Sequence, residues 1–188
     1  KNIINIAGFN YRMTETSAAI AREQLKKLND LNKIRLDLVN QLKKSLEKFD
    51  FLRPFKGPKE CNSCDCNNFS KCVSTYYIFP IRYFPNISGI DRNTFISTIN
   101  AEGLMFYQGY TRPLYMQPVY QLKSLFKNGY PFSAKENQDC QQDYSEGICP
   151  VAEKLYHEEM VINEHIRFPH TSKDIQDIVD AINKTISF

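Results

Sequence analysis

The stretch TETSAAIAREQLKKLNDLNKIRLDLVNQLKKSLEKF, residues 14–49, carries the strongest structural pattern in the chain. Its apolar side chains recur in steps of three and four and share one helical face. They are Ala18, Ala21, Leu25, Leu28, Leu31, Ile34, Leu38, Leu42, Leu46 and Phe49. Thr14 is a suitable N-cap, and Glu15 places negative charge at the positive helix end. The pattern predicts one long helix.

At about 1.5 Å per residue, this helix would span roughly 50 Å, which exceeds the width of a small domain. A helix of that length usually links two bodies, so we expect an interdomain helix over residues 14–50. A coiled coil is the alternative, but the charged residues do not occupy clear flanking heptad positions.

The chain after this helix alternates short strands with helices. Residues 53–71 are rich in Pro, Gly, Asn and Cys and predict an irregular loop. Residues 75–83 predict a strand in which Pro80 suggests an edge or a bulge. Asp91 is expected to cap a helix that Gly103 ends, followed by a strand over 104–107.

The last third of the chain predicts further short elements. We expect helices over 119–126 and 149–157, with Pro150 in the first turn of the second, and a strand over 160–162. A final helix from Ser172 places Ile175, Ile178 and Ile182 on one face. The predicted fold class is α/β, a small sheet with helices behind a long connecting helix.

Composition narrows the functional classes. The chain has 188 residues, of which 42% are hydrophobic and 24% charged, with a formal net charge of +3. It has no apolar run long enough to cross a bilayer and no signal-peptide pattern, so we expect a cytoplasmic protein without a membrane partner. Its lysines are interleaved with acids, which argues against a nucleic-acid partner. An anionic small molecule remains compatible.

Three motifs carry a family resemblance that covers nearly the whole chain. The segment GFNYRMTE at 8–15, with SAAI at 17–20, is similar to a G-x-N-x-R-x-T/D-E turn that opens an interdomain helix. RPLYMQPVY at 112–120 resembles a P-L-H-x-Q-P-x-Y segment, and CPVAE at 149–153 resembles a C/F-P-x-A-E helix. The chain thus resembles the pyridoxal-phosphate (PLP) sugar aminotransferases of the DegT, DnrJ and StrS type.

The resemblance implies the C-terminal small domain of an aspartate-aminotransferase-like, fold type I enzyme. Residues 1–13 would be a remnant of the large PLP-binding domain, 14–50 the interdomain helix, and 51–188 the small α/β domain. The family assembles as homodimers with shared active sites. We therefore expect a homodimer as the partner assembly, with a nucleotide-sugar substrate and an amino-acid donor.

Site residues follow from the resemblance position by position. The Schiff-base lysine of the family lies upstream of the turn at Gly8, so we expect the chain to begin in mid-fold and not to transaminate alone. Asn10 matches an asparagine that reaches the PLP phosphate of the neighbouring subunit. Arg12 matches a position that meets substrate phosphates. Without the resemblance, Asn10 would only shape a turn and Arg12 would be a solvated cation.

Tyr115 stands where many family members carry histidine, a residue whose imidazole could touch the substrate. We expect Tyr115 in the substrate-binding set. A phenol and an imidazole differ in acidity and reach, so the sugar contact here departs from the family pattern.

Three functions remain open. The first is PLP-dependent transfer of an amino group, from glutamate, to a keto group of a nucleotide-linked sugar. The second is a sugar dehydratase of the same superfamily, in which histidine replaces the lysine. The third, from another class, is a non-catalytic module that dimerises or binds a partner.

A cysteine cluster that is unusual for the family gives this third hypothesis a candidate metal site. Four thiolates can hold zinc tetrahedrally, and a short C-x2-C turn suits that geometry. The alternatives are free thiols or an oxidised pair. The four candidate ligands are Cys61, Cys64, Cys66 and Cys72.

Histidines and tyrosines yield no further catalytic motif. The run beginning at His157 lacks the second histidine four residues on that a zincin helix requires, so the three histidines are interpreted as structural or surface residues. Several tyrosines near prolines could stack on a nucleotide base, although such residues more often fill a core. They are Tyr107, Tyr110, Tyr115 and Tyr120.

Overall fold

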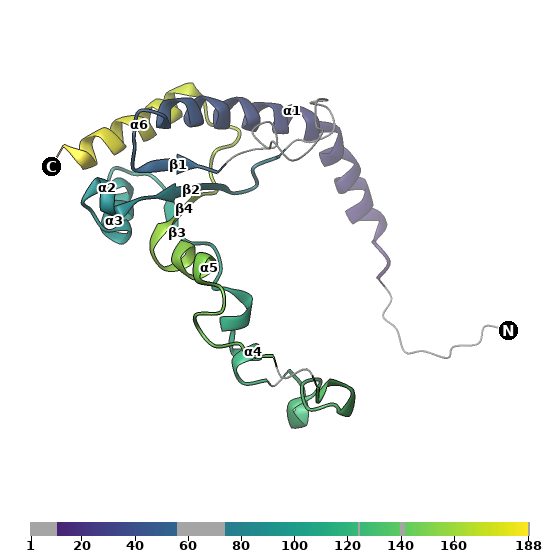
Figure 1. The fold of residues 1–188 in the computed structure, drawn as a ribbon. Coiled ribbons are helices and arrows are strands. Elements are labelled where there is room, and N and C mark those ends of the chain that lie inside the picture. The colour runs from purple at the N-terminus through teal and green to yellow at the C-terminus, as the bar shows by residue number, and fades with distance from the viewer. Residues whose placement is uncertain (1–10, 56–73, 124, 140–141, 188) are drawn as a thin grey trace, which may run out of the picture.

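The computed structural model describes residues 11–55, 74–123, 125–139 and 142–187. These residues form a body, made of one sheet with helices packed on it, and an arm that projects from the body (Figure 1). The long N-terminal helix runs along the top of the body and continues beyond it (Figure 1). The arm and the free end of the helix are therefore separate projections.

The sheet has four strands in the order β1-β2-β4-β3, and each neighbouring pair is antiparallel. Ile81 pairs with Val161 across the centre, and Tyr107 pairs with Ile162 at the β3 side. The strands are β1 (Leu52–Pro54), β2 (Phe79–Tyr83), β3 (Phe106–Gln108) and β4 (Met160–Asn163).

One face of the sheet carries the hydrophobic core. Side chains alternate between the two faces along a strand, and accordingly Phe79, Ile81 and Tyr83 of β2 are buried while the intervening residues are only partly so. Tyr83 also donates a hydrogen bond to the carbonyl of Ile90 at 2.8 Å, and its ring stacks on Phe95. The helices that contribute to the core are α1 (Glu15–Leu46), α3 (Arg92–Ala101) and α6 (Ser172–Ile186).

Helix α1 confirms the strongest prediction from the sequence. The Thr14 side chain accepts a hydrogen bond from the Ser17 amide at 3.2 Å, as expected of an N-cap. Only the C-terminal part of the helix is buried, with Leu42 and Leu46 fully covered, whereas Leu25 is 67% exposed. The apolar face of the N-terminal half is uncovered by the described residues, and the interdomain role stays a prediction.

Two sequence expectations about the sheet were wrong. Residues 52–54 form β1, although residues 53–71 were expected to form a loop. The strand was missed because three residues are too few to show an alternation of buried and exposed side chains. Pro80 is not in an edge strand, since β2 pairs with both β1 and β4. The Pro80 carbonyl faces Phe55, just past the paired end of β1, so the missing N–H costs no ladder bond.

The described residues between 109 and 149 form the arm, in which aromatic rings pack between short helices. Tyr120 and Tyr144 lie 5.3 Å apart between ring centroids, and Phe132 makes an edge contact with each. The predicted helix over 119–126 is shorter than expected. The short helices of the arm are η2 (Leu114–Met116), α4 (Pro118–Gln121), η3 (Lys127–Gly129) and η4 (Lys135–Asn137).

The chain returns from the arm to the sheet through α5 (Pro150–Lys154) and a π-helical turn, η5 (Leu155–Glu159). A one-turn helix, α2 (Pro85–Ser88), joins β2 to α3. No helix in the described part of the chain is both long and apolar enough to cross a membrane.

Candidate substrate-binding site

The base of the arm is organised by one buried carboxylate. Glu153 of α5 is 9% exposed and accepts a hydrogen bond from the hydroxyl of Tyr115 in η2. It also accepts from the amide of Gly147, at 2.8 Å to Oε1 and 3.0 Å to Oε2, and from the amide of Cys149 at 3.4 Å. One side chain thus joins η2, the turn at 147–149 and the start of α5.

Local sequence explains why Glu153 takes this position. Pro150 is the first residue of α5, and the N-cap Cys149 has no side-chain hydrogen bond to the helix. The first turn of a helix leaves backbone N–H groups without helical partners. Glu153 reaches back to the N-cap amide, as the acid of a capping box does, but from one position later in the helix.

The contact between Tyr115 and Glu153 shifts the pKa values of both groups, so that a neutral phenol lies beside an ionised carboxylate. The Tyr115 hydroxyl lowers the pKa of Glu153, burial opposes that effect, and the backbone amides of Gly147 and Cys149 lower it further. Burial raises the pKa of Tyr115, and the hydrogen bond to Glu153 raises it again. The phenol is therefore the donor and the carboxylate the acceptor.

Two glutamines fix the backbone around Tyr115. Gln121 Nε2 donates to the carbonyl of Tyr115 at 2.7 Å and to that of Tyr144 at 2.6 Å. Gln117 Nε2 donates to the carbonyl of Arg112 at 3.0 Å. These bonds tie the segment at 112–121 into one unit, so the half-buried Tyr115 ring has a defined position.

Comparison with known proteins assigns this chain to a protein family. The model of the DegT/DnrJ/EryC1/StrS aminotransferase family matches residues 1–142. The chain belongs to this aminotransferase family. That match includes the turn at 8–15 and the segment at 112–120, and it ends before the helix that carries Glu153.

Solved aminotransferase structures share the fold. An aminotransferase from Psychrobacter cryohalolentis is 20% identical, covers 97% of this chain and has a TM-score of 0.65. Helicobacter pylori PseC, an aminotransferase involved in the biosynthesis of pseudoaminic acid, is 19% identical over 100% of this chain, with a TM-score of 0.67. A DegT DnrJ EryC1 StrS aminotransferase from Brucella abortus is 18% identical over 98%, with a TM-score of 0.67.

The chain spans about two fifths of each of these structures, covering 41%, 42% and 39% of their lengths in the same order. Identities this low show the fold alone. The structural matches confirm the predicted α/β fold class with its long helix and small sheet, which these aminotransferase structures share.

The other site residues predicted for the aminotransferase are not brought together by the described part of the chain. Arg12 is exposed, and no hydrogen bond or ion pair between described residues joins it to Tyr115. Asn10 lies outside the described residues. The phosphate contacts of Asn10 and Arg12 therefore stay predictions.

The four cysteines of the proposed zinc site also lie outside the described residues: Cys61, Cys64, Cys66 and Cys72. Within the described ranges, no group of three or more His, Cys, Asp or Glu side chains is placed to hold a metal ion.

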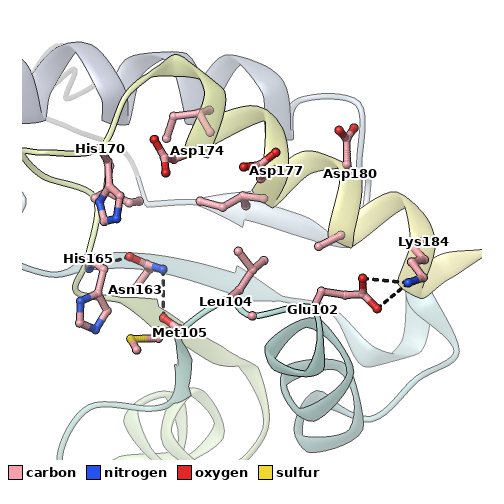
Figure 2. A pocket seen from close by; sticks show the side chains of 15 residues that line it. Glu102, Leu104, Met105, Asn163, His165, His170, Asp174, Asp177, Asp180 and Lys184 are labelled. Carbon is pink, nitrogen blue, oxygen red and sulfur yellow. Dashed lines mark hydrogen bonds and ion pairs between the residues drawn. The ribbon is translucent and has the colours of Figure 1, made fainter.

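A cavity of about 680 Å³ opens between α6 and the loops at 102–105 and 163–170 (Figure 2). Asp174, Asp177 and Asp180 line its α6 side, and Lys184 is paired with Glu102 at 2.7 Å. Excess carboxylates repel an anion, so this cavity does not fit the phosphate of PLP.

A second cavity, of about 500 Å³, lies between α3 and η5, and its cations are already engaged. Glu159 pairs with Arg82 at 2.6 Å and with Lys154 at 3.1 Å. Arg92 donates to the carbonyl of Tyr156 at 2.7 Å. Neither of these two cavities therefore fits the phosphate of PLP.

Sequence reasoning did not single out Glu153, the hydrogen-bond partner of Tyr115. The signal was present, because Glu153 closes the CPVAE motif. Its partner could not be found from the sequence, since Tyr115 lies 38 positions away and only the return of the arm brings the two together.

Proposed function

We propose that this chain is the C-terminal part of a PLP-dependent sugar aminotransferase, which moves an amino group from glutamate to a keto group of a nucleotide-linked sugar. Family membership supports the reaction class. One feature of the structure carries the proposal for this chain. The segment for which the family resemblance suggests a substrate contact is held at the base of the arm by the hydrogen bond between Tyr115 and Glu153.

PLP, when bound, supplies the electron sink for amino transfer. We propose that Asn10 binds its phosphate across a homodimer and that Arg12 binds phosphates of the substrate. Tyr115 would form one wall of the sugar site. The lysine that the reaction requires is proposed to lie outside these 188 residues, and the enzyme is proposed to work in the cytoplasm.

Isotope transfer tests this function directly. The complete polypeptide is incubated with PLP, ¹⁵N-labelled glutamate and a panel of UDP- and dTDP-linked keto sugars, and the products are analysed by mass spectrometry. We expect ¹⁵N in an amino sugar. Loss of water from a sugar without ¹⁵N incorporation would instead indicate the dehydratase, and unchanged sugars throughout would contradict both activities.

A further inference from the structure

The sheet has two edges, β1 and β3, because the strand order is β1-β2-β4-β3 (Figure 1). In an antiparallel pair, every second residue of an edge strand directs its backbone N–H and C=O groups away from the neighbouring strand. Such outward groups are a template on which a strand of another molecule can pair. The residues that face outward on each edge therefore decide whether the sheet can be extended.

On β1, the outward residues are Leu52 and Pro54. The carbonyl of Phe51 accepts a hydrogen bond from the amide of Phe84 at 2.8 Å, so Phe51 bonds inward and the alternation turns residues 52 and 54 outward. The outward amide of Leu52 donates to the carbonyl of Phe49 at 3.1 Å, and Pro54 has no N–H. Over the three residues of β1, no outward N–H group is left to donate to an added strand.

On β3, a side chain takes the place of a partner strand. The amide of Gly109 donates to the carbonyl of Met160 at 2.8 Å, so the alternation turns Phe106 and Gln108 outward. Asn100 Nδ2 donates to the carbonyl of Phe106, and Asn100 Oδ1 accepts from the amide of Phe106, each at 2.8 Å. The carboxamide thus satisfies both outward groups of Phe106, as an adjacent strand would.

The position of Asn100 is set by the core. Asn100 lies in the last turn of α3, directly after the fully buried Ile99, so packing of the helix places the carboxamide beside β3. Of the outward backbone groups on β3, those of Gln108 have no hydrogen bond to a described residue. One residue provides too few bonds to offset the freedom that two molecules lose on association.

We infer that Asn100 closes the β3 edge and keeps the sheet from pairing with the β3 strand of a second copy of this chain. The inference is independent of the proposed function, because it concerns the backbone groups of the sheet edge. Removing the carboxamide would leave Phe106 and Gln108 both open, and two alternate residues are the repeat that an added antiparallel strand requires.

The test measures self-association of the complete polypeptide by sedimentation velocity, from about 1 µM to about 100 µM, a range in which unpaired strand edges become prone to association. Asn100→Ala removes the carboxamide. Asn100→Leu also removes it, but keeps a side chain of similar size that favours a helix. Asn183→Ala is the matched control, because Asn183 also lies in a helix and its side chain makes no hydrogen bond to a described residue.

A second substitution asks whether any association occurs through β3. Gln108→Pro removes the outward N–H at the neighbouring position, and proline is tolerated on an edge strand where the N–H faces solvent. It is added to both Asn100 variants and is also made alone.

We expect both Asn100 variants to show a weight-average mass that rises with concentration to at least about twice that of the wild type, because an open edge recruits a second copy. Asn183→Ala and Gln108→Pro alone should follow the wild type. Adding Gln108→Pro to either Asn100 variant should remove the rise. At low concentration, hydrogen exchange of residues 104–110 should be faster in the Asn100 variants than in the wild type, and association should slow it again.

Two results would overturn the inference. The first is a mass equal to that of the wild type in both Asn100 variants at every concentration. The second is association that Gln108→Pro does not reverse, since that result would indicate general loss of folding instead of pairing at β3. Asn100→Leu decides the question if Asn100→Ala folds poorly.

Discussion

Arg82 of β2 and Glu159 of η5 form an ion pair, with Nε lying 2.6 Å from Oε2, that fastens the π-helical turn to the sheet. Lys154 approaches the other carboxylate oxygen at 3.1 Å. Burial raises the pKa of Glu159, but the hydrogen bonds from Arg82 and Lys154 outweigh it and leave the pKa below its usual value. An ionised, buried carboxylate therefore holds the π-helical turn against the sheet.

Glu159→Gln should lower the free energy of unfolding by about 1–2 kcal/mol, because it weakens two charge-assisted hydrogen bonds. Arg82 and Lys154 donate these bonds, and both side chains are partly exposed. Urea unfolding of the purified chain measures this. The neighbouring Glu158→Gln is the control, since Glu158 is exposed and should change stability by less than about 0.5 kcal/mol. Equal stability of both variants would contradict the role of the pair.

Acid should destabilise the protein through the same carboxylates. The pKa values of Glu153 and Glu159 lie below the ordinary value of 4.5 in the folded state. The unfolded chain therefore takes up protons first as pH falls, and the free energy of unfolding should decrease as pH drops through 4.5 and below. Urea titrations between pH 6 and pH 3.5 would show this slope. Glu153→Gln should make the dependence of the free energy of unfolding on pH less steep. An unchanged slope in that variant would contradict the ionised state of Glu153 in the folded protein.

Arg92 should contribute to stability through backbone carbonyl acceptors, and no carboxylate of the described residues hydrogen bonds to it. It is 6% exposed and donates to the carbonyls of Tyr156 and Met160. Arg92→Met leaves these acceptors without the guanidinium and should cost about 1–3 kcal/mol in urea unfolding. Arg167→Met, at an exposed position, is the matched control. A cost at Arg92 no greater than at Arg167 would show that solvent replaces the lost donor.

The proposed phosphate contact of Asn10 predicts weaker cofactor binding in the complete polypeptide. Asn10→Ala should raise the Kd for PLP about tenfold, as expected for a lost hydrogen bond to a charged group. Equilibrium dialysis with absorbance detection measures this Kd. Asn29→Ala, on the exposed part of α1, should leave the Kd unchanged. Identical affinities in the two variants would remove Asn10 from the cofactor site.

Local sequence patterns, namely helix caps and periodic apolar residues, made much of the fold predictable. The caps at Thr14 and Asp91 and the apolar face of α6 have local causes, and the structure places all of them as expected. Strand β1 was missed because three residues are too short to show alternation. The position of Pro80 depends on where its neighbouring strand ends, which is a tertiary fact.

The candidate site was only partly predictable for a similar reason. Tyr115 was found through its motif, but its partner Glu153 depends on the path of the arm. The acidic cavity beside α6 likewise joins three separate segments of the chain (Figure 2). Periodicity describes one segment at a time, whereas a site is a relationship between segments.

Borohydride trapping with peptide mass spectrometry, on the complete polypeptide after incubation with PLP, tests the central claim most directly. The account predicts a PLP-modified lysine at a position before Gly8 and outside these 188 residues. Bound cofactor that borohydride does not fix to any lysine would contradict the aminotransferase and favour the dehydratase, and no bound PLP at all would favour a non-catalytic module.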